Sequence, residues 1–217
     1  MRKNPSSRNP EKRSFPIMKM IYLDNAATSF PKPKEVLDFM YSFYQQYGIN
    51  PGRSGYDLSL ETEGMVQKTR KMLTTLFNGK DFNRLTFSYN ASDSLNMILQ
   101  GILEKGNHVI TSHLEHNSVL RPLYHFEHNG YIQVSYIPFD RKGYIDPGDI
   151  KKAVRKDTKL VILNHCSNVI GTIQPLADVG KICRDLDIIF TVDASQSAGA
   201  IPIDVERMQI DVLAFTG

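Results

Sequence analysis

The sequence predicts an α/β fold, in which a mostly parallel β-sheet carries helices on both faces. From Leu85 onward, short runs rich in β-branched and aromatic residues alternate with segments of helical periodicity, which is the pattern of a parallel sheet with crossover helices. The 217 residues are 41% hydrophobic, so they can bury a substantial core. The region after Met20 contains no internal repeat and no linker that would divide it into independent domains.

The β-branched and aromatic runs predict six strands joined by right-handed crossovers. These strands are expected at residues 84–89, 108–112, 132–139, 160–166, 188–193 and 212–215. The carboxyl ends of parallel strands meet at one edge of the sheet, and α/β folds hold their ligands at that edge. Polar residues that follow these strands are therefore the first candidates for a site.

The clearest helix begins at Ser92 and is expected to end at Gly106, because apolar residues between them recur at the spacing of one buried helix face. That face is formed by Leu95, Ile98, Leu99, Ile102 and Leu103. A second helix of the same type is expected to begin at Leu176, and others to cover 146–155, 33–47 and 58–77. The loop 48–55 between the last two is rich in Gly and Pro, and we expect it to serve a site.

The first twenty residues are expected to form a disordered basic tail, residues 1–20, ahead of the domain at 21–217. Six Lys and Arg residues stand there against one acid, Glu11, and this excess is the source of the formal net charge of +3. A transit peptide is the alternative, although no amphipathic helix emerges, and Met18 or Met20 could be the true start. The remainder is close to neutral, which does not indicate nucleic-acid binding.

Cysteine usage and hydropathy indicate a cytoplasmic protein without a membrane partner. Cys166 and Cys183 are the only cysteines, and their spacing matches neither a zinc site nor a CxxC motif, which fits a reducing compartment. Both are read as structural residues. No run is long enough to span a bilayer, and no spacing among the six histidines demands a metal.

Asp193 is the most informative residue, because it stands at the exit of the strongly apolar segment 186–192. A carboxylate at the end of a buried strand is costly unless a cation or hydrogen-bond donors meet it. The protonated ring nitrogen of pyridoxal phosphate would provide such a cation, and an acidic partner for this nitrogen is a mark of pyridoxal phosphate sites.

Two other strand ends carry residues that suit the same cofactor. The turn at 88–94 leads into the helix from Ser92, and its free backbone amides and hydroxyl could hold a phosphate. Asn90 or Ser92 could instead be an ordinary helix cap. His116 follows the strand 108–112 and could stack on an aromatic ring, although a solvated loop histidine is the alternative.

Amide side chains follow two further strands. Asn168 could hydrogen-bond the phenolic oxygen of the cofactor, or it could form an Asx turn. Gln196, three residues after Asp193, could reach the same oxygen from the opposite side, or it could cap a loop. Other chemistries fit less well, because the chain has no dinucleotide fingerprint after a strand, no Walker motif and no Gly-x-Ser-x-Gly elbow.

The chain resembles the class V aminotransferase family of fold-type I pyridoxal phosphate enzymes, and most closely its cysteine desulfurase and selenocysteine lyase branch. The resemblance runs from an opening strand and loop at 21–29 to Thr216-Gly217, and includes Glu115-His116 and the segments 167–171 and 193–197. It implies the large domain of that fold, incomplete at its C-terminus. In the family, Thr-Gly is followed at once by His-Lys, whose lysine binds the cofactor covalently.

The resemblance also implies a role for each motif residue. Catalytic roles fall to His116 and Asp193, and substrate binding falls to Asn25 and Arg53. Tyr56 stands where the family usually has a histidine. The residues implied to bind pyridoxal 5'-phosphate are Ala91, Ser92, His116, Asn168, Asp193, Gln196 and Thr216.

The function implied is that of a cysteine desulfurase-like enzyme acting on L-cysteine or a related small amino acid, as a homodimer in the full-length family. The chain is expected to be a fragment that is inactive without the lysine. A class V aminotransferase or another pyridoxal phosphate lyase is one alternative. A non-catalytic remnant, or a subunit completed by a partner chain, is the other.

Overall fold

The computed structural model describes residues 20–52 and 55–217. The chain divides into two compact units, Met1–Tyr41 and Ser42–Gly217, and helix α1 (Lys34–Gln46) crosses the boundary between them. In the first unit, the Tyr22 hydroxyl donates to the carbonyls of Asp24 and Thr28, both at 2.9 Å. Residues 21–29 form a turn and irregular backbone, so the opening strand expected from the family resemblance is wrong for this chain.

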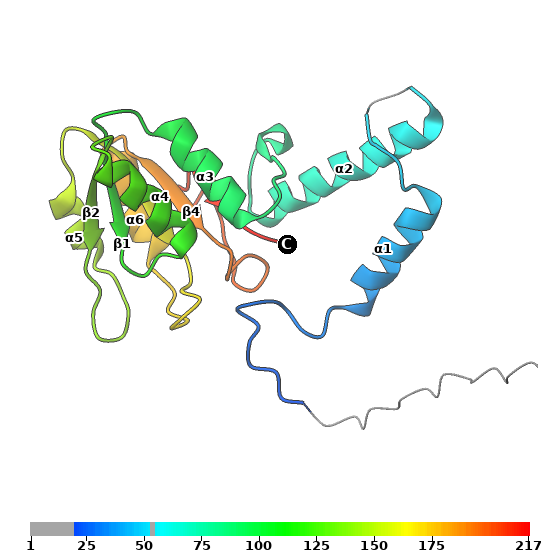
Figure 1. Cartoon of the computed structure of the whole chain (residues 1–217), viewed down its shortest axis with the longest axis horizontal. Coiled ribbons are helices and arrows are strands. Elements are labelled where there is room, and N and C mark those ends of the chain that lie inside the picture. Colours follow the sequence, from blue (N-terminus) through cyan, green and yellow to red (C-terminus); the bar gives the residue numbers. More distant parts are fainter. Residues whose placement is uncertain (1–19, 53–54) are drawn as a thin grey trace, which may run out of the picture. The chain divides into compact units, whose positions relative to one another are not determined.

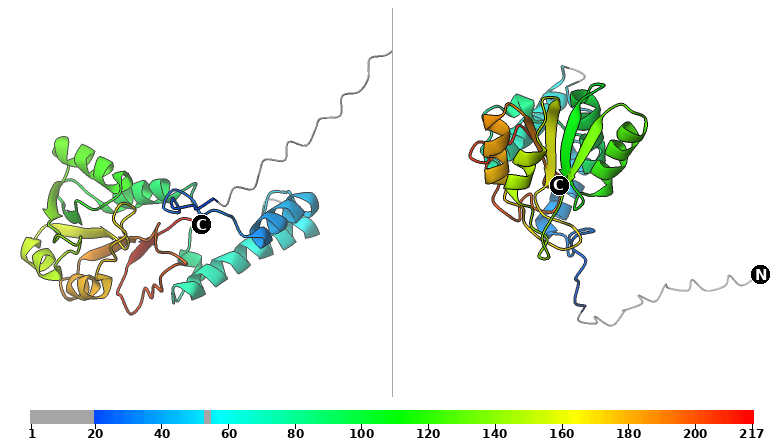
Figure 2. Two further views of the ribbon diagram at one scale, coloured as in Figure 1. Left: turned by 90° about the horizontal axis from the view of Figure 1, so that it is seen from below. Right: turned by 90° about the vertical axis from the view of Figure 1, so that its left-hand side faces the viewer.

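The second unit is built on a parallel sheet (Figures 1 and 2). Its strands are β1 (His108–Ser112), β2 (Gln133–Ile137), β3 (Thr158–Asn164), β4 (Ile189–Asp193) and β5 (Val212–Ala214). They lie in the order β2-β1-β3-β4-β5, and every neighbouring pair is parallel. Five of the six predicted strands are thus confirmed, with bounds that differ by no more than two residues at each end.

Apart from α4, the α-helices of this unit agree closely with the sequence periodicity. The helices are α2 (Asp57–Leu76), α3 (Ala91–Ile102), α4 (Asn117–His128), α5 (Pro147–Ala153) and α6 (Leu176–Asp185), with a short 3₁₀ helix, η1 (Phe82–Arg84). Helix α3 ends earlier than predicted, because Leu103 already has extended backbone angles at the C-cap. Helix α5 begins with Pro147 after Asp146, whose carboxylate caps the N–H of Gly148.

Two hydrophobic clusters cover the two faces of the sheet. Leu95 and Leu99 of α3 join Val119 and Leu123 of α4 against one face, which includes Ile162 of β3. The opposite cluster is formed by buried residues of α5, α6 and the sheet, among them Ile150, Val179, Cys183, Val161, Phe190 and Val192. Helices therefore cover both faces, as predicted, and the polar strand ends remain at the rim.

Helix α6 approaches the chain after β4 very closely. A Cβ atom built on Gly180 would lie 1.9 Å from the carbonyl oxygen of Met208, far inside van der Waals contact. Gly180 is one of the buried residues of α6. The absence of a side chain at this position is therefore a condition for the packing of this layer.

The predicted strand 84–89 is wrong. Residues 85–88 have no regular secondary structure, and η1 ends at Arg84. The side chain of Arg70 on α2 donates to the carbonyl of Leu85 and lies 5.1 Å from the centre of the Phe87 ring. These contacts hold the segment in place although no neighbouring strand pairs with it. A run of β-branched or aromatic residues forms a strand only where another strand pairs with it.

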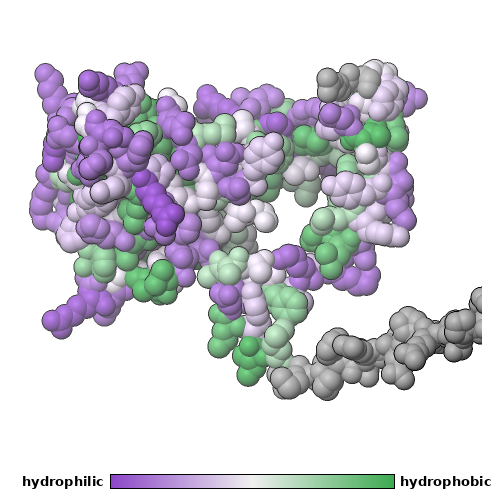
Figure 3. Space-filling view, viewed as in Figure 1, coloured by the Kyte–Doolittle hydropathy of each residue, from purple (hydrophilic) through white to green (hydrophobic). Residues whose placement is uncertain are grey.

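Helix α4 has no counterpart among the predicted elements, because Pro122 and three histidines or tyrosines obscure its pattern. Helix α1 was predicted, yet it has no buried residue. Apolar side chains remain exposed on α1 (Figure 3), namely Val36, Leu37, Phe39, Met40 and Tyr44. Within residues 20–52 and 55–217, no helix combines the length and the apolar character needed to cross a membrane.

Candidate functional site

The sheet has one point where its strand order reverses. The connection from β1 runs through α4 to β2, whereas the connection from its neighbour β3 runs through α6 to β4 on the other side, so the order reverses between β1 and β3. Open parallel sheets hold ligands at the carboxyl ends of the strands beside such a point. Here β1 ends at Ser112 and β3 at Asn164, and Asn164 lies opposite Asp193, the end of β4. The predicted site residues of these strands therefore share one edge.

Asp193 lies buried at this edge, with 5% of its surface exposed. Its Oδ1 atom accepts hydrogen bonds from the N–H and the hydroxyl of Ser195, at 2.9 and 2.6 Å. No ion pair found in the described part of the chain includes Asp193. A buried carboxylate without a protein cation is costly, so this position is suited to a cation that a ligand brings.

His116 forms the N-cap of α4, and its exposed ring is held from one side. Its Nδ1 atom accepts from the Ser118 N–H at 3.1 Å and lies 2.8 Å from the Ser118 hydroxyl. Because a backbone N–H can only donate, Nδ1 acts as the acceptor and the proton of the neutral ring belongs on Nε2. The ring is thereby fixed in orientation while its surface remains accessible.

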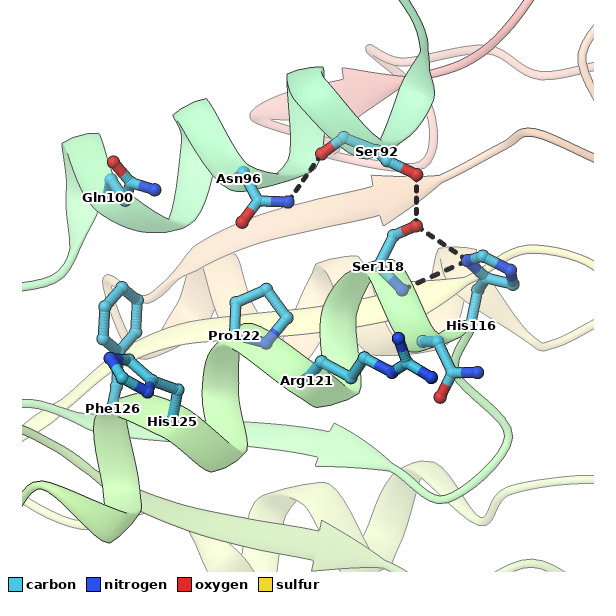
Figure 4. A pocket seen from close by; sticks show the side chains of 10 residues that line it. Ser92, Asn96, Gln100, His116, Ser118, Arg121, Pro122, His125 and Phe126 are labelled. Atoms are coloured by element: carbon cyan, nitrogen blue, oxygen red, sulfur yellow. Dashed lines mark hydrogen bonds between the residues drawn. The ribbon is translucent and has the colours of Figure 1, made fainter.

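The Ser118 hydroxyl also joins the two predicted halves of the site. It lies 2.5 Å from the hydroxyl of Ser92 in the first turn of α3, so one chain of hydrogen bonds connects Ser92 with His116 (Figure 4). We predicted both residues, but the serine that connects them was not among the candidates.

The turn before α3 shows the capping that was the alternative interpretation. Asn90 is the N-cap, and its side chain accepts from the Asp93 N–H at 2.9 Å. The Asp93 carboxylate faces back to the Tyr89 N–H at 3.4 Å. The N–H groups of Ala91 and Ser92 remain in the first turn, where the helix supplies no acceptor, so this turn can still donate to an anion.

Asn168, Gln196 and Thr216 follow the ends of β3, β4 and β5, on the same edge of the sheet. Asn168 and Thr216 are exposed, and Gln196 is half-buried. The turn at Asn168 is organised by its neighbour, because the Ser167 hydroxyl accepts from two following N–H groups at 3.3 and 3.4 Å.

Asn25 and Arg53 are the two residues that were expected to bind substrate. Asn25 belongs to the first unit, where its Oδ1 atom accepts from the Phe30 N–H at 3.2 Å. Arg53 lies outside the described residues. Tyr56 is the N-cap residue of α2, and 49% of its surface is exposed.

A cavity of about 560 Å³ begins at Ser92 and His116 and extends between α3 and α4 (Figure 4). Further along, its walls are formed by Asn96 and Gln100 of α3 and by Arg121, His125 and Phe126 of α4. Polar side chains from two helices thus face one hollow beside the sheet edge. No cluster of His, Cys, Asp or Glu in residues 20–52 and 55–217 is arranged to hold a metal ion.

Three buried polar residues at the same edge carried no role in the sequence interpretation. The His165 imidazole is 2% exposed and pairs with the Ser197 hydroxyl at 3.0 Å, and burial lowers its pKa. The backbone N–H of His165 donates to the Asp193 carbonyl at 2.8 Å, which ties the end of β3 to the end of β4. Glu115 and Asn164 are buried beside them. A polar residue directly at the end of an apolar strand was the available signal for Asn164 and His165.

Comparison with known families decides the membership of the chain. The family model described as aminotransferase class-V matches residues 21–217. The chain belongs to the class V aminotransferase family. Enzymes of this family depend on pyridoxal phosphate. The donor set above fits that cofactor, because it combines a buried carboxylate lacking a protein cation, an accessible oriented imidazole and a helix N-terminus.

Curated relatives and solved structures agree with this membership. A cysteine desulfurase IscS of Dictyoglomus turgidum is 37% identical over 90% of the chain and 50% of its own length. A mitochondrial cysteine desulfurase of Candida albicans is 39% identical over 90% of the chain and 40% of its own length. The chain spans about half the length of the curated relatives it matches.

Among solved structures, the apo cysteine desulfurase of Thermococcus onnurineus NA1 has a TM-score of 0.83 at 35% identity, over 90% of the chain and 49% of its own length. A structure described as SspA in complex with cysteine has a TM-score of 0.85 at 30% identity, over 90% of the chain and 56% of its own length. The predicted fold, a parallel sheet of the fold-type I large domain, is confirmed.

Proposed function

We propose that this chain provides the pyridoxal-phosphate-binding part of a cysteine desulfurase-like enzyme, which removes sulfur from L-cysteine or a related small amino acid. The observation that carries the proposal is Asp193, a buried carboxylate at the carboxyl end of β4 that forms no ion pair with described residues. The names of the relatives favour sulfur removal over transamination. Homodimeric assembly and a cytoplasmic location are part of the proposal and depend on the family resemblance.

Each residue of the site has a task in this proposal. The bound cofactor supplies an electron sink for carbanion chemistry on an amino acid. Asp193 keeps the proton on the ring nitrogen, and His116 holds one face of the ring. The N–H groups of Ala91 and Ser92 and the Ser92 hydroxyl donate to the phosphate.

The remaining residues orient the ligands. Asn168 and Gln196 donate to the phenolic oxygen of the cofactor, and Thr216 adds a hydroxyl at the same sheet edge. Asn25 and Arg53 bind the carboxylate of the amino acid. A class V aminotransferase or another pyridoxal phosphate lyase would use the same residues for a different outcome.

Titration of the 217-residue chain with pyridoxal 5'-phosphate tests the proposal. We expect one saturable site by calorimetry, with pyridoxal binding at least about tenfold more weakly because it lacks the phosphate for the α3 turn. Borohydride reduction of the complex should fix no adduct at a unique lysine, since none of the residues assigned to the site is a lysine. Equal affinity for the two ligands, or no saturable binding, would contradict the proposal.

His116→Ala should weaken binding of pyridoxal 5'-phosphate by about fivefold, because a stacked ring pair contributes about 1 kcal/mol beyond area burial. His128→Ala is the matched control, since His128 is an exposed histidine of the same helix that packs on Tyr124, with ring centres 5.7 Å apart. The same calorimetric titration checks both variants. A loss of similar size in both variants would argue against the stacking role.

A further inference from the structure

Glu115 is a buried acid that the proposed function does not use. It lies in the connection from β1 to α4, directly before His116, and only 6% of its surface is exposed. Burial of an ionised carboxylate without a cation is unfavourable, so a group of this kind is kept either paired or neutral. No ion pair among the described residues includes Glu115.

The connection that contains Glu115 is hydrogen-bonded to the ends of two strands. The Oε1 atom of Glu115 accepts from the Ser112 hydroxyl at 2.7 Å, at the end of β1. The backbone of Asn164, at the end of β3, is close enough to the carboxyl group to oppose part of the rise in the pKa of Glu115. The Asn164 side chain donates to the carbonyl of Leu114 at 2.6 Å. The loop that carries His116 is therefore attached to both β1 and β3 around this one carboxyl group.

Two buried oxygens in this cluster have no donor. They are Oε2 of Glu115 and Oδ1 of Asn164. Both atoms are acceptors if Glu115 is ionised, so neither can satisfy the other, and each would cost free energy in the interior. A proton on Oε2 changes this balance, because the neutral carboxyl group buries no charge and its O–H is a donor among acceptors.

The charge of Asp193 also favours the neutral form of Glu115. Asp193 lies opposite Asn164 in the β3–β4 register, and its negative charge disfavours a second one on Glu115. His113 and His116 flank Glu115 in sequence in the same connection, and Asp193 is the charged group that acts on its pKa. Burial is the largest cause, and with the repulsion from Asp193 it raises the pKa of Glu115 to about 8.

We propose that Glu115 is a positioning residue of the site: as a neutral carboxylic acid it fixes the His116 loop to the ends of β1 and β3 and leaves Asp193 without a competing charge. The role toward His116 and Asp193 rests on the proposed function. The protonation of Glu115 does not rest on it, because the atoms involved all belong to this chain.

The stability of the chain without cofactor tests the protonation. Glu115 binds a proton in the folded chain up to a pH of about 8 but in the unfolded chain only up to about 4.5. Between these values folding is therefore increasingly disfavoured as the pH rises. Glu115→Gln keeps a neutral donor and acceptor of the same shape, so we expect its urea midpoint to exceed that of the wild type by a margin that grows from about pH 5 to about pH 8 and is then constant.

Glu104→Gln is the matched control, because Glu104 is exposed in the loop before β1 and should leave the wild-type profile unchanged. Infrared spectroscopy at pH 6 gives a second measurement on the wild-type chain. It should show the C=O band of a buried protonated carboxyl group, and this band should be missing in Glu115→Gln. Parallel stability profiles of wild type and Glu115→Gln, or no such band, would overturn the proposal.

Cofactor titration separates the positioning role from protonation. Glu115→Gln should retain the wild-type affinity for pyridoxal 5'-phosphate, whereas Glu115→Leu, which has no donor or acceptor for Ser112 and Asn164, should lose at least about tenfold. If Glu115→Leu binds as the wild type does, the positioning role is wrong even where the pH profile holds. If the wild type itself does not bind, the proposed function fails, and the stability and infrared results still decide the protonation of Glu115.

Discussion

Asp193→Asn should weaken binding of pyridoxal 5'-phosphate by about 100-fold, because loss of one member of a buried ion pair costs about 3 kcal/mol or more. The amide has nearly the same shape and can still accept from the N–H and hydroxyl of Ser195, which hold the carboxylate at 2.9 and 2.6 Å. The loss therefore reports the charge and not the fold. Calorimetric titration of the 217-residue chain measures it.

The same substitution should leave the chain without cofactor at least as stable as the wild type, since it removes a buried charge that forms no ion pair among described residues. Asp185→Asn is the control, because Asp185 is an exposed acid at the end of α6. It should change neither property. If Asp193→Asn binds the cofactor within threefold of the wild type, Asp193 does not neutralise the ring, and the functional proposal loses its main support.

Gly180→Ala should lower the free energy of unfolding by about 2 kcal/mol, because overpacking of a well-packed layer costs about 1–3 kcal/mol. Its Cβ would lie 1.9 Å from the carbonyl oxygen of Met208, and a backbone atom cannot move away as a side-chain tip can. For a chain of this size, the change corresponds to a decrease of about 6 °C in Tm. Thermal and urea unfolding measure it.

Gly101→Ala is the same change at a helical glycine of α3 whose added Cβ would meet no atom within 4 Å. It should raise the free energy of unfolding by about 0.5 kcal/mol, since alanine loses less conformational freedom in a helix than glycine does. The two substitutions should thus have opposite signs. Equal effects would mean that helix propensity, and not the contact with Met208, decides the tolerance at Gly180.

The central strands were predictable because each is an apolar run of strand length bounded by polar or turn residues. Strands β1 and β4 show this best, as their burial patterns admit no exposed position. The local sequence pattern predicted one strand that does not form and missed one helix. The segment 84–89 has strand composition, but Arg70 satisfies the Leu85 carbonyl instead of a neighbouring strand. Helix α4 contains Pro122, which masks a buried face at Val119 and Leu123.

For the site, the sequence predicted which sheet edge to inspect, because parallel strands bring residues distant in sequence to one rim. It did not predict how these residues are connected. The hydroxyl of Ser118 bridges Ser92 and His116 across 26 residues of chain, and such a contact depends on how α3 packs on α4. The proton on Glu115 was equally inaccessible, since it follows from burial and from unpaired oxygens in the folded chain.

The Ser92–Ser118–His116 connection has a consequence for ligand choice. Its hydrogen bonds of 2.5 and 2.8 Å hold the start of α3 and the imidazole ring at a set spacing. A ligand that binds its anionic group at the start of α3 and stacks its aromatic ring on His116 must have a distance between these two groups that matches this spacing. Longer or shorter phosphate esters of the same heterocycle should therefore be rejected by geometry, even though their charge is unchanged.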